Sequence, residues 1–153
     1  MRIAALFLTA CLLACAHSTI SGTNIADTSE NRSVLETFSH YRDALEARDP
    51  SALFGLAAPS YSDKGDPAHR LGPTDYASLR DKLQQDLAKV TGIKLEATIK
   101  DIEVKDDEAR LDYFQVLHYA VKTPTGEIWK SESDDARMNF VRVSGQWKIA
   151  SGL

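Results

Sequence analysis

The spacing of apolar residues changes near Thr91, and this change constrains the fold more than any other feature of the sequence. Before Thr91, apolar residues recur every three or four positions, which is the period of an amphipathic helix. After it, they alternate with polar residues, which is the period of a half-buried strand. Helices followed by consecutive strands predict an α+β domain with an antiparallel sheet.

Three helices are expected in the first part of the chain. The first covers residues 33–48. The second runs from Pro50 to about Ala57, with Asp49 as its cap and Pro50 at its first position. The third follows Thr74 as its cap. Their core-facing stripes are Val34, Leu35, Phe38, Tyr41 and Leu45 in the first helix and Tyr76, Leu79, Leu83 and Leu87 in the third.

Four long strands are expected after the helices. Apolar residues stand at odd positions up to Ile99 and at even positions from Ile102. This shift predicts a β-bulge near Lys100-Asp101, which would bend the sheet. The strands are expected at 95–104, 109–121, 127–143 and 146–153, with a further short strand at 61–63.

The first residues have the features of a secretory signal peptide, 1–14. Arg2 precedes a run of apolar or small residues, Ile3–Ala14, which is shorter than the roughly 20 residues of a membrane-spanning helix. Leu12-Leu13-Ala14-Cys15 resembles the bacterial lipobox, in which the cysteine receives a lipid and the chain is cut before it. Cys15 is therefore the expected lipid attachment site. Leu8-Thr9-Ala10-Cys11 fits the same pattern behind a shorter run, and an ordinary signal peptide or a buried apolar helix are further alternatives.

Residues 15–31 are expected to form a flexible tether, because they are polar and small and have no helical or strand period. Such a tether would reach about 20 Å, and the folded domain would follow at 32–153. In lipoproteins, an Asp after the modified cysteine marks retention in the inner membrane. Ala16 stands there, so the chain is expected at the outer membrane, on its periplasmic side. With Cys11 removed and Cys15 acylated, the domain has no free thiol, which suits an oxidising compartment.

The composition excludes several classes of partner and cofactor. With 18 basic and 22 acidic residues, the net charge of −4 gives no basic surface for nucleic acid. The four histidines show no spacing typical of metal ligands. The sequence also contains no phosphate loop, dinucleotide fingerprint or nucleophile elbow. Neither a metal nor a cofactor is expected.

Three strings carry a family resemblance: Tyr41-Arg-Asp-Ala-Leu-Glu-Ala-Arg-Asp49 with the short helix after it, Asp107-Glu-Ala-Arg-Leu-Asp-Tyr113, and Trp147-Lys-Ile-Ala-Ser151. In this order, they resemble nuclear transport factor 2-like domains, a group that includes ketosteroid isomerase, scytalone dehydratase and SnoaL-like cyclases. The resemblance covers about residues 32–153. It implies a cone, in which a curved antiparallel sheet wraps three N-terminal helices and leaves a pocket at its open end. Such domains often pair through their outer sheet faces, and Phe114 and Val116 would suit a homodimer.

The resemblance and the strand alternation together suggest a set of pocket residues. An isomerase of this fold needs a carboxylate base and buried donors for the enolate oxygen. Tyr41 matches the tyrosine donor of ketosteroid isomerase, and Asp63 or Asp134 could be the base. The second donor is missing, because Ala136 stands at its place and Asp135 would lie on the opposite face. The expected ligand pocket consists of Tyr41, Tyr113, Gln115, Tyr119, Trp147 and Ser151.

Three functions follow from these observations. The first is a non-catalytic envelope lipoprotein that binds a small apolar ligand or a protein partner, and the lipid anchor and the incomplete acid–base set favour it. The second is an isomerase, dehydratase or cyclase that uses Asp63 or Asp134 as base and Tyr41 as donor. The third is a self-associating scaffold. Tyr41 could also be a plain core residue and Asp63 a turn residue.

Overall fold

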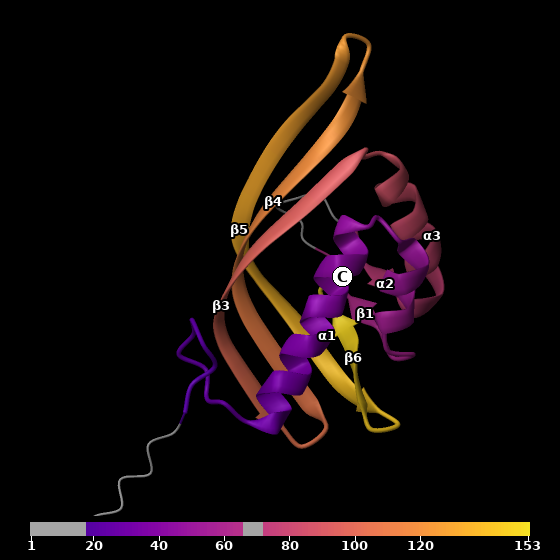
Figure 1. The fold of residues 1–153 in the computed structure, drawn as a ribbon. Helices are drawn as coiled ribbons and strands as arrows, with labels where there is room; N and C mark the ends of the chain where they lie inside the picture. The colour runs from indigo at the N-terminus through magenta and orange to yellow at the C-terminus, as the bar shows by residue number, and fades with distance from the viewer. Residues whose placement is uncertain (1–17, 66–71) are drawn as a thin grey trace, which may run out of the picture.

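Three helices and four long strands form most of the part of the chain that the computed structural model describes, residues 18–65 and 72–153 (Figure 1). The signal peptide and the lipid attachment expected at Cys15 lie outside the described residues. Among the helices described, none is long and apolar enough to cross a membrane. In chain order, the elements are α1 (Ser29–Glu46), α2 (Pro50–Leu56), β1 (Ser62–Asp63), β2 (Thr74–Asp75), α3 (Tyr76–Ala88), β3 (Gly92–Lys105), β4 (Glu108–Thr123), β5 (Gly126–Val143) and β6 (Gln146–Ser151).

The long strands form an antiparallel sheet in the order β3-β4-β5-β6, which curves around α1 (Figure 1). The pairing of β3 with β4 shifts between Ile99 and Asp101, which confirms the predicted bulge. A second shift, which was not predicted, lies between Asn139 and Phe140 where β5 pairs with β6. The expected α+β class with a curved antiparallel sheet and three helices is confirmed.

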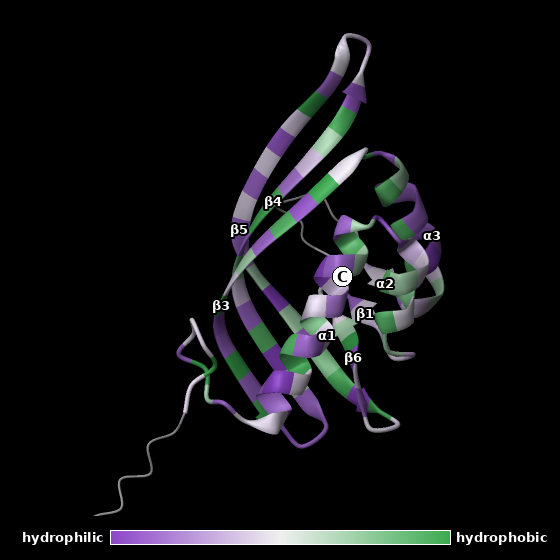
Figure 2. Ribbon diagram, viewed as in Figure 1, coloured by the Kyte–Doolittle hydropathy of each residue, from purple (hydrophilic) through white to green (hydrophobic). Residues whose placement is uncertain are grey.

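The core lies between the concave face of the sheet and the helices. Hydrophobic and hydrophilic residues alternate along the strands, as Figure 2 shows, so one face of each strand can be buried. Burial of a large apolar side chain stabilises the fold by about 1.5–3 kcal/mol. The largest fully buried side chains are those of Phe140, Leu53, Leu79, Leu111, Met138, Ile149 and Val34.

Local capping sets where the shorter helices begin. The Asp49 carboxylate accepts hydrogen bonds from the backbone N–H groups of Ser51 and Ala52, and Pro50 is the first residue of α2, as predicted. Helix α3 is capped by Asp75 and not by Thr74, one residue later than expected. Asp75 and Ser78 exchange hydrogen bonds in a capping box. Thr74 pairs instead with Asp63 in the small β1–β2 sheet.

Within the described residues, regular structure begins earlier than the sequence suggested. Helix α1 starts at Ser29 with Thr28 as its cap, and residues 18–28 fold back in a turn, in which Thr19 pairs with Ala26. We call residues 18–28 the clasp. The side chain of Ile25 in the clasp is only 5% exposed. The expectation of a tether without regular structure up to residue 31 therefore differs from the structure from Ser18 onward.

The β4–β5 hairpin extends beyond the rest of the sheet at the end opposite the clasp (Figure 1). Strand β3 begins at Gly92, which pairs with Ala120, so the tip of the hairpin continues without it. Trp129 on this hairpin is 60% exposed. A Cβ atom at Gly92 would lie 2.9 Å from the indole of Trp129, and Ala120 between the two is fully buried. The indole therefore reaches past Ala120 to the backbone of Gly92.

Gly152→Ala is expected to destabilise the fold more than the matched control Gly145→Ala. Both glycines have positive φ angles, +94° and +81°, where a side chain costs about 1–2 kcal/mol. A Cβ at Gly152 would also lie 2.5 Å from the carbonyl oxygen of Arg137, whereas a Cβ at Gly145 would meet nothing within 4 Å. Urea unfolding should show a further loss of about 1 kcal/mol or more in Gly152→Ala. Equal losses would mean that Gly152 is not held against β5.

Candidate functional site

Three buried tyrosines lie on the concave side of the sheet. Tyr41 of α1, Tyr61 before β1 and Tyr113 of β4 are 8%, 2% and 2% exposed. The ring of Phe38 packs 5.8 Å from Tyr41 and 4.8 Å from Tyr113, measured between ring centroids. Tyr41 and Tyr113 were expected in the site. Tyr61 was missed, because a tyrosine beside a short edge strand carries no periodic signal.

Burial keeps these three phenols protonated. It raises the pKa of Tyr41 to about 12, and the neighbouring Tyr61 adds to the rise. Burial also raises the pKa of Tyr61 to about 12, although its hydrogen bond with the backbone of Leu153 works against the rise. The pKa of Tyr113 is raised most, by burial and then by the nearness of Tyr41 and Asp134. At neutral pH, all three therefore have an O–H group that can donate a hydrogen bond.

Two polar pairs follow the tyrosines along the concave face toward the end of the hairpin. The Gln115 amide donates to Asp134 over 2.8 Å, and the Tyr119 hydroxyl donates to Glu132 over 2.6 Å. The hydrogen bond with Glu132 raises the pKa of Tyr119. Gln115 and Asp134 are half-buried and pair directly across β4 and β5. We call Tyr41, Tyr61, Tyr113, Gln115 and Asp134 the concave-face site.

Two backbone hydrogen bonds hold the Asp63 carboxylate in place. Its two carboxylate oxygens accept hydrogen bonds from the backbone N–H groups of Gly65, at 2.7 Å, and Gly152, at 2.8 Å. The hydroxyl of nearby Tyr61 accepts from the backbone N–H of Leu153 at 3.2 Å. Asp63 thus holds the end of the chain to the β1 segment. Of the residues expected as base or donor, Tyr41 and Asp134 both lie near Tyr113. Asp63 lies instead beside Tyr61.

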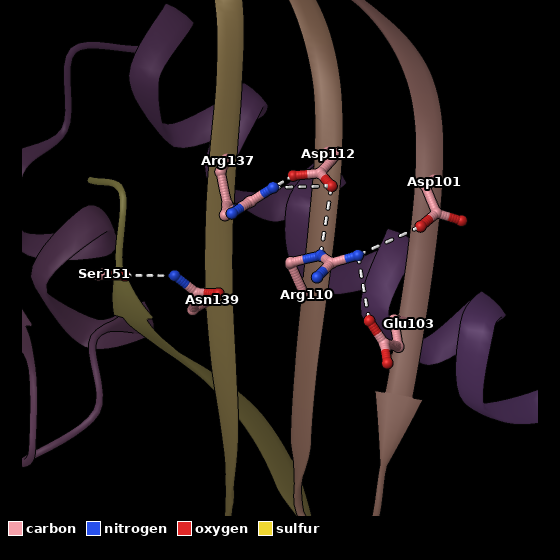
Figure 3. Close-up of polar contacts among 7 residues, drawn as sticks. All are labelled: Asp101, Glu103, Arg110, Asp112, Arg137, Asn139 and Ser151. Atoms are coloured by element: carbon pink, nitrogen blue, oxygen red, sulfur yellow. Dashed lines mark hydrogen bonds and ion pairs between the residues drawn. The ribbon is translucent and has the colours of Figure 1, made fainter.

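Two of the predicted pocket residues lie away from this site. Ser151 accepts a hydrogen bond from the Asn139 amide at 2.8 Å on the convex face, because the register shift in β6 turns it there (Figure 3). Trp147 is 4% exposed and pairs with Arg142, whose guanidinium lies 4.2 Å from the centroid of the indole ring. Arg142 is about 20 Å along β5 from Ala136, the partner of Tyr113.

The convex face carries a network of ion pairs that the sequence analysis missed (Figure 3). Arg110 contacts Asp112 at 3.2 Å and Glu103 at 3.0 Å, and Arg137 contacts Asp112 at 2.6 Å. Lys100 pairs with Asp135. The sequence signal that could have predicted this network is the opposite charge of residues paired across strands, as in Glu103 with Arg110 and Asp112 with Arg137. Phe114 is 37% exposed on this face, so an apolar homodimer contact there would be surrounded by charges.

Within 18–65 and 72–153, no group of three or more His, Cys, Asp or Glu side chains is placed to hold an ion. The carboxylates of the convex face are instead paired with arginine and lysine.

The buried phenols predict that the fold weakens in alkaline solution. Unfolded tyrosines lose their protons near pH 10, whereas Tyr41 and Tyr61 keep theirs up to about pH 12. Unfolding therefore releases protons in this range, and the free energy of unfolding falls by about 1.4 kcal/mol per pH unit for each such tyrosine. In urea unfolding between about pH 10 and pH 11, Tyr41→Phe should show a smaller fall than the parent chain. Tyr76→Phe, which leaves the three buried tyrosines intact, is the control. If the free energy of unfolding fell as steeply with pH in Tyr41→Phe as in the parent chain, the raised pKa of Tyr41 would be contradicted.

Comparison with known proteins bears on the fold. No family model matches the sequence, and no curated protein matches it. Solved structures do match. A conserved protein from Planctomyces limnophilus superposes with a TM-score of 0.68 at 18% identity, covering 79% of this chain and 91% of the other. A proposed dehydratase of the NTF2-like family from Streptomyces avermitilis gives 0.69 at 16% identity, covering 79% and 92%.

A third structure, a proposed scytalone dehydratase from Novosphingobium aromaticivorans, gives a TM-score of 0.65 at 18% identity and covers 79% of each chain. These identities are too low to transfer an activity, but the superpositions cover most of the described residues. The curved sheet, the helices on its concave side and these likenesses agree with the resemblance found in the sequence. The chain has the nuclear transport factor 2-like fold.

Proposed function

We propose that this chain is a lipid-anchored envelope protein whose domain binds a small, largely apolar molecule on its concave face without transforming it. One observation carries the non-catalytic part of the proposal. One of the two carboxylates expected as base, Asp63, accepts a backbone N–H hydrogen bond on each of its oxygens and holds the chain end in place. Protonation of Asp63 during catalysis would weaken these charge-assisted hydrogen bonds, so its structural role disfavours a role in proton transfer.

The chemistry of the concave-face site indicates the kind of ligand. The phenols of Tyr41 and Tyr113 are protonated and can donate at neutral pH, and their burial, which raises their pKa values, favours this neutral form. Their surroundings on the concave face are apolar and include Leu95 and Leu111. A molecule with one carbonyl or similar acceptor on a hydrocarbon frame would match this combination, because apolar walls with few polar groups are typical of small-molecule sites.

Asp134 supports a second candidate, a small-molecule isomerase or dehydratase. Its carboxylate lies near Tyr113 and accepts one hydrogen bond, from Gln115. A carboxylate next to a buried phenol is the pairing that proton abstraction beside a carbonyl requires. Two of the matched structures are named as proposed dehydratases. In this reading, Asp134 is the base and Tyr113 or Tyr41 the donor.

One probe separates the two candidates. 2-Acetonaphthone is apolar, has one carbonyl acceptor and carries methyl protons that exchange with solvent deuterium when a base enolises it. We expect the mature chain to bind it, with affinity about 2–10-fold lower in Tyr113→Phe and unchanged in Phe114→Ala, a control on the convex face. We expect no acceleration of methyl deuteration over buffer. Accelerated deuteration that Asp134→Asn abolishes would favour the enzyme, and absence of binding would contradict both candidates.

The anchor part of the proposal rests on Leu12-Leu13-Ala14-Cys15, which resembles the lipobox. Diacylglycerol on the Cys15 thiol together with an N-acyl chain exceeds the two chains that stable attachment needs. Ala16 after the cysteine favours the outer membrane, with the domain in the periplasm.

Cys15→Ser is expected to abolish incorporation of labelled palmitate in a bacterial host and to move the protein from the membrane to the soluble fraction. The reason is that serine lacks the thiol that the lipid modifies. Cys11→Ser is the matched control and should keep both the label and the membrane location. Loss of the label in Cys11→Ser alone would place the anchor at Cys11 instead.

A further inference from the structure

The clasp sits at one end of the molecule, and the β4–β5 hairpin forms the other (Figure 1). We infer that the clasp end lies against the lipid bilayer and that the hairpin points away from it. The clasp end consists of the clasp, the first turn of α1 and the turns 106–107 and 144–145. This inference rests on the proposed lipid at Cys15, and it identifies which surface of the domain meets the membrane.

The clasp is a closed structure held by its own backbone. The N–H of Asp27 donates to the carbonyl of Ser18 at 2.7 Å, and the N–H of Ile20 donates to the carbonyl of Ile25 at 2.9 Å. The Thr23 hydroxyl donates to the carbonyl of Ile20 at 2.9 Å. These bonds tie the two ends of the clasp together, so Ser18 is held beside the start of α1.

The clasp is also fastened to the domain. Ile25 is 5% exposed, and the amide of the buried Asn31 donates to the carbonyl of Ala26 at 2.9 Å. Arg32 forms two hydrogen bonds with Asp27, one of them 2.7 Å long. An apolar anchor and side-chain bonds to α1 make the clasp part of the domain rather than part of a tether.

Only two residues, Ala16 and His17, stand between Cys15 and Ser18. Three successive Cα–Cα steps span at most about 11 Å. The spacer expected from the sequence would have reached about 20 Å and left the domain free to turn. Strand β5, with 18 residues, would measure about 60 Å if straight. The link is therefore short compared with the domain, and it keeps the clasp end close to the lipid.

Most charges at the clasp end take part in ion pairs. Arg142 contacts Glu30 at 2.6 Å and Asp107 at 3.2 Å, and Arg32 pairs with Asp27. Two arginines face four carboxylates there, since Asp106 adds to Asp27, Glu30 and Asp107, so the clasp end is mildly acidic and carries no basic patch for anionic lipid. The convex face also carries ion pairs, Arg110 with Glu103 and Arg137 with Asp112. Attachment then depends on the acyl chains, and orientation on the short link.

Energy transfer to the membrane tests the orientation. Because the only cysteine expected in the mature chain is acylated, Asn24→Cys in the clasp and Lys122→Cys near the hairpin tip would each take a single donor dye; both side chains are exposed. The lipidated variants are placed in phosphatidylcholine vesicles that contain a headgroup-labelled acceptor lipid. We expect transfer from position 24 to be several-fold stronger than from position 122. Equal transfer from a palmitoylated protein would overturn the inference while leaving the proposed anchor intact.

A longer linker provides the control. Insertion of a Gly/Ser segment of about 15 residues between Ala16 and His17 should bring the two transfer values together, because the domain can then turn freely. An unchanged ratio would mean that the short link does not set the orientation, and this would overturn the inference. Protein without palmitate that still binds the vesicles would overturn the proposed anchor and the inference together.

Discussion

The curvature of the sheet is the constraint on which the other features depend. A flat antiparallel sheet would not wrap around α1. It would leave Tyr113 of β4 far from Tyr41 of α1 and from Tyr61 before β1. The register shift between Ile99 and Asp101 bends β3, and the shift between Asn139 and Phe140 bends the contact of β5 with β6. Each shift adds a residue to one strand, which increases the local twist. The concave face that results encloses Phe38 and the three phenols.

The sequence was sufficient for the elements and for one bend. Long segments with a strict period predicted α1, β4 and β5 within a few residues, and the change of parity between Ile99 and Ile102 predicted the first bulge. These predictions succeed because burial of one face requires apolar residues at regular spacings along the sequence. The second bulge left no such trace, because the strand after it ends at Ser151, before a new alternation could appear. Ser151 was consequently assigned to the wrong face.

The candidate site was predictable only in part, for a related reason. Parity placed Tyr113, Gln115 and Asp134 on one face, and the structure puts them together. The role of Asp63 depends on the backbone of Gly152, which is far away in the sequence, and a backbone donor has no signature in residue type. The clasp is similar: its backbone bonds are compatible with many polar sequences, and the burial of Ile25 and the side-chain bonds of Asn31 and Arg32 appear only in the fold. The site and the clasp thus depend on contacts with backbone groups, and residue type does not reveal these contacts.

The contact between Trp129 and Gly92 has a consequence for how this sequence can vary. The indole lies where a side chain at position 92 would stand, and it covers Ala120 between the two strands. A larger residue at 92 is compatible with the hairpin only if the side chain at 129 becomes smaller, and a smaller residue at 129 uncovers Ala120 unless position 92 gains a side chain. The two positions are coupled through space, so substitutions that are harmful one at a time become tolerable as a pair.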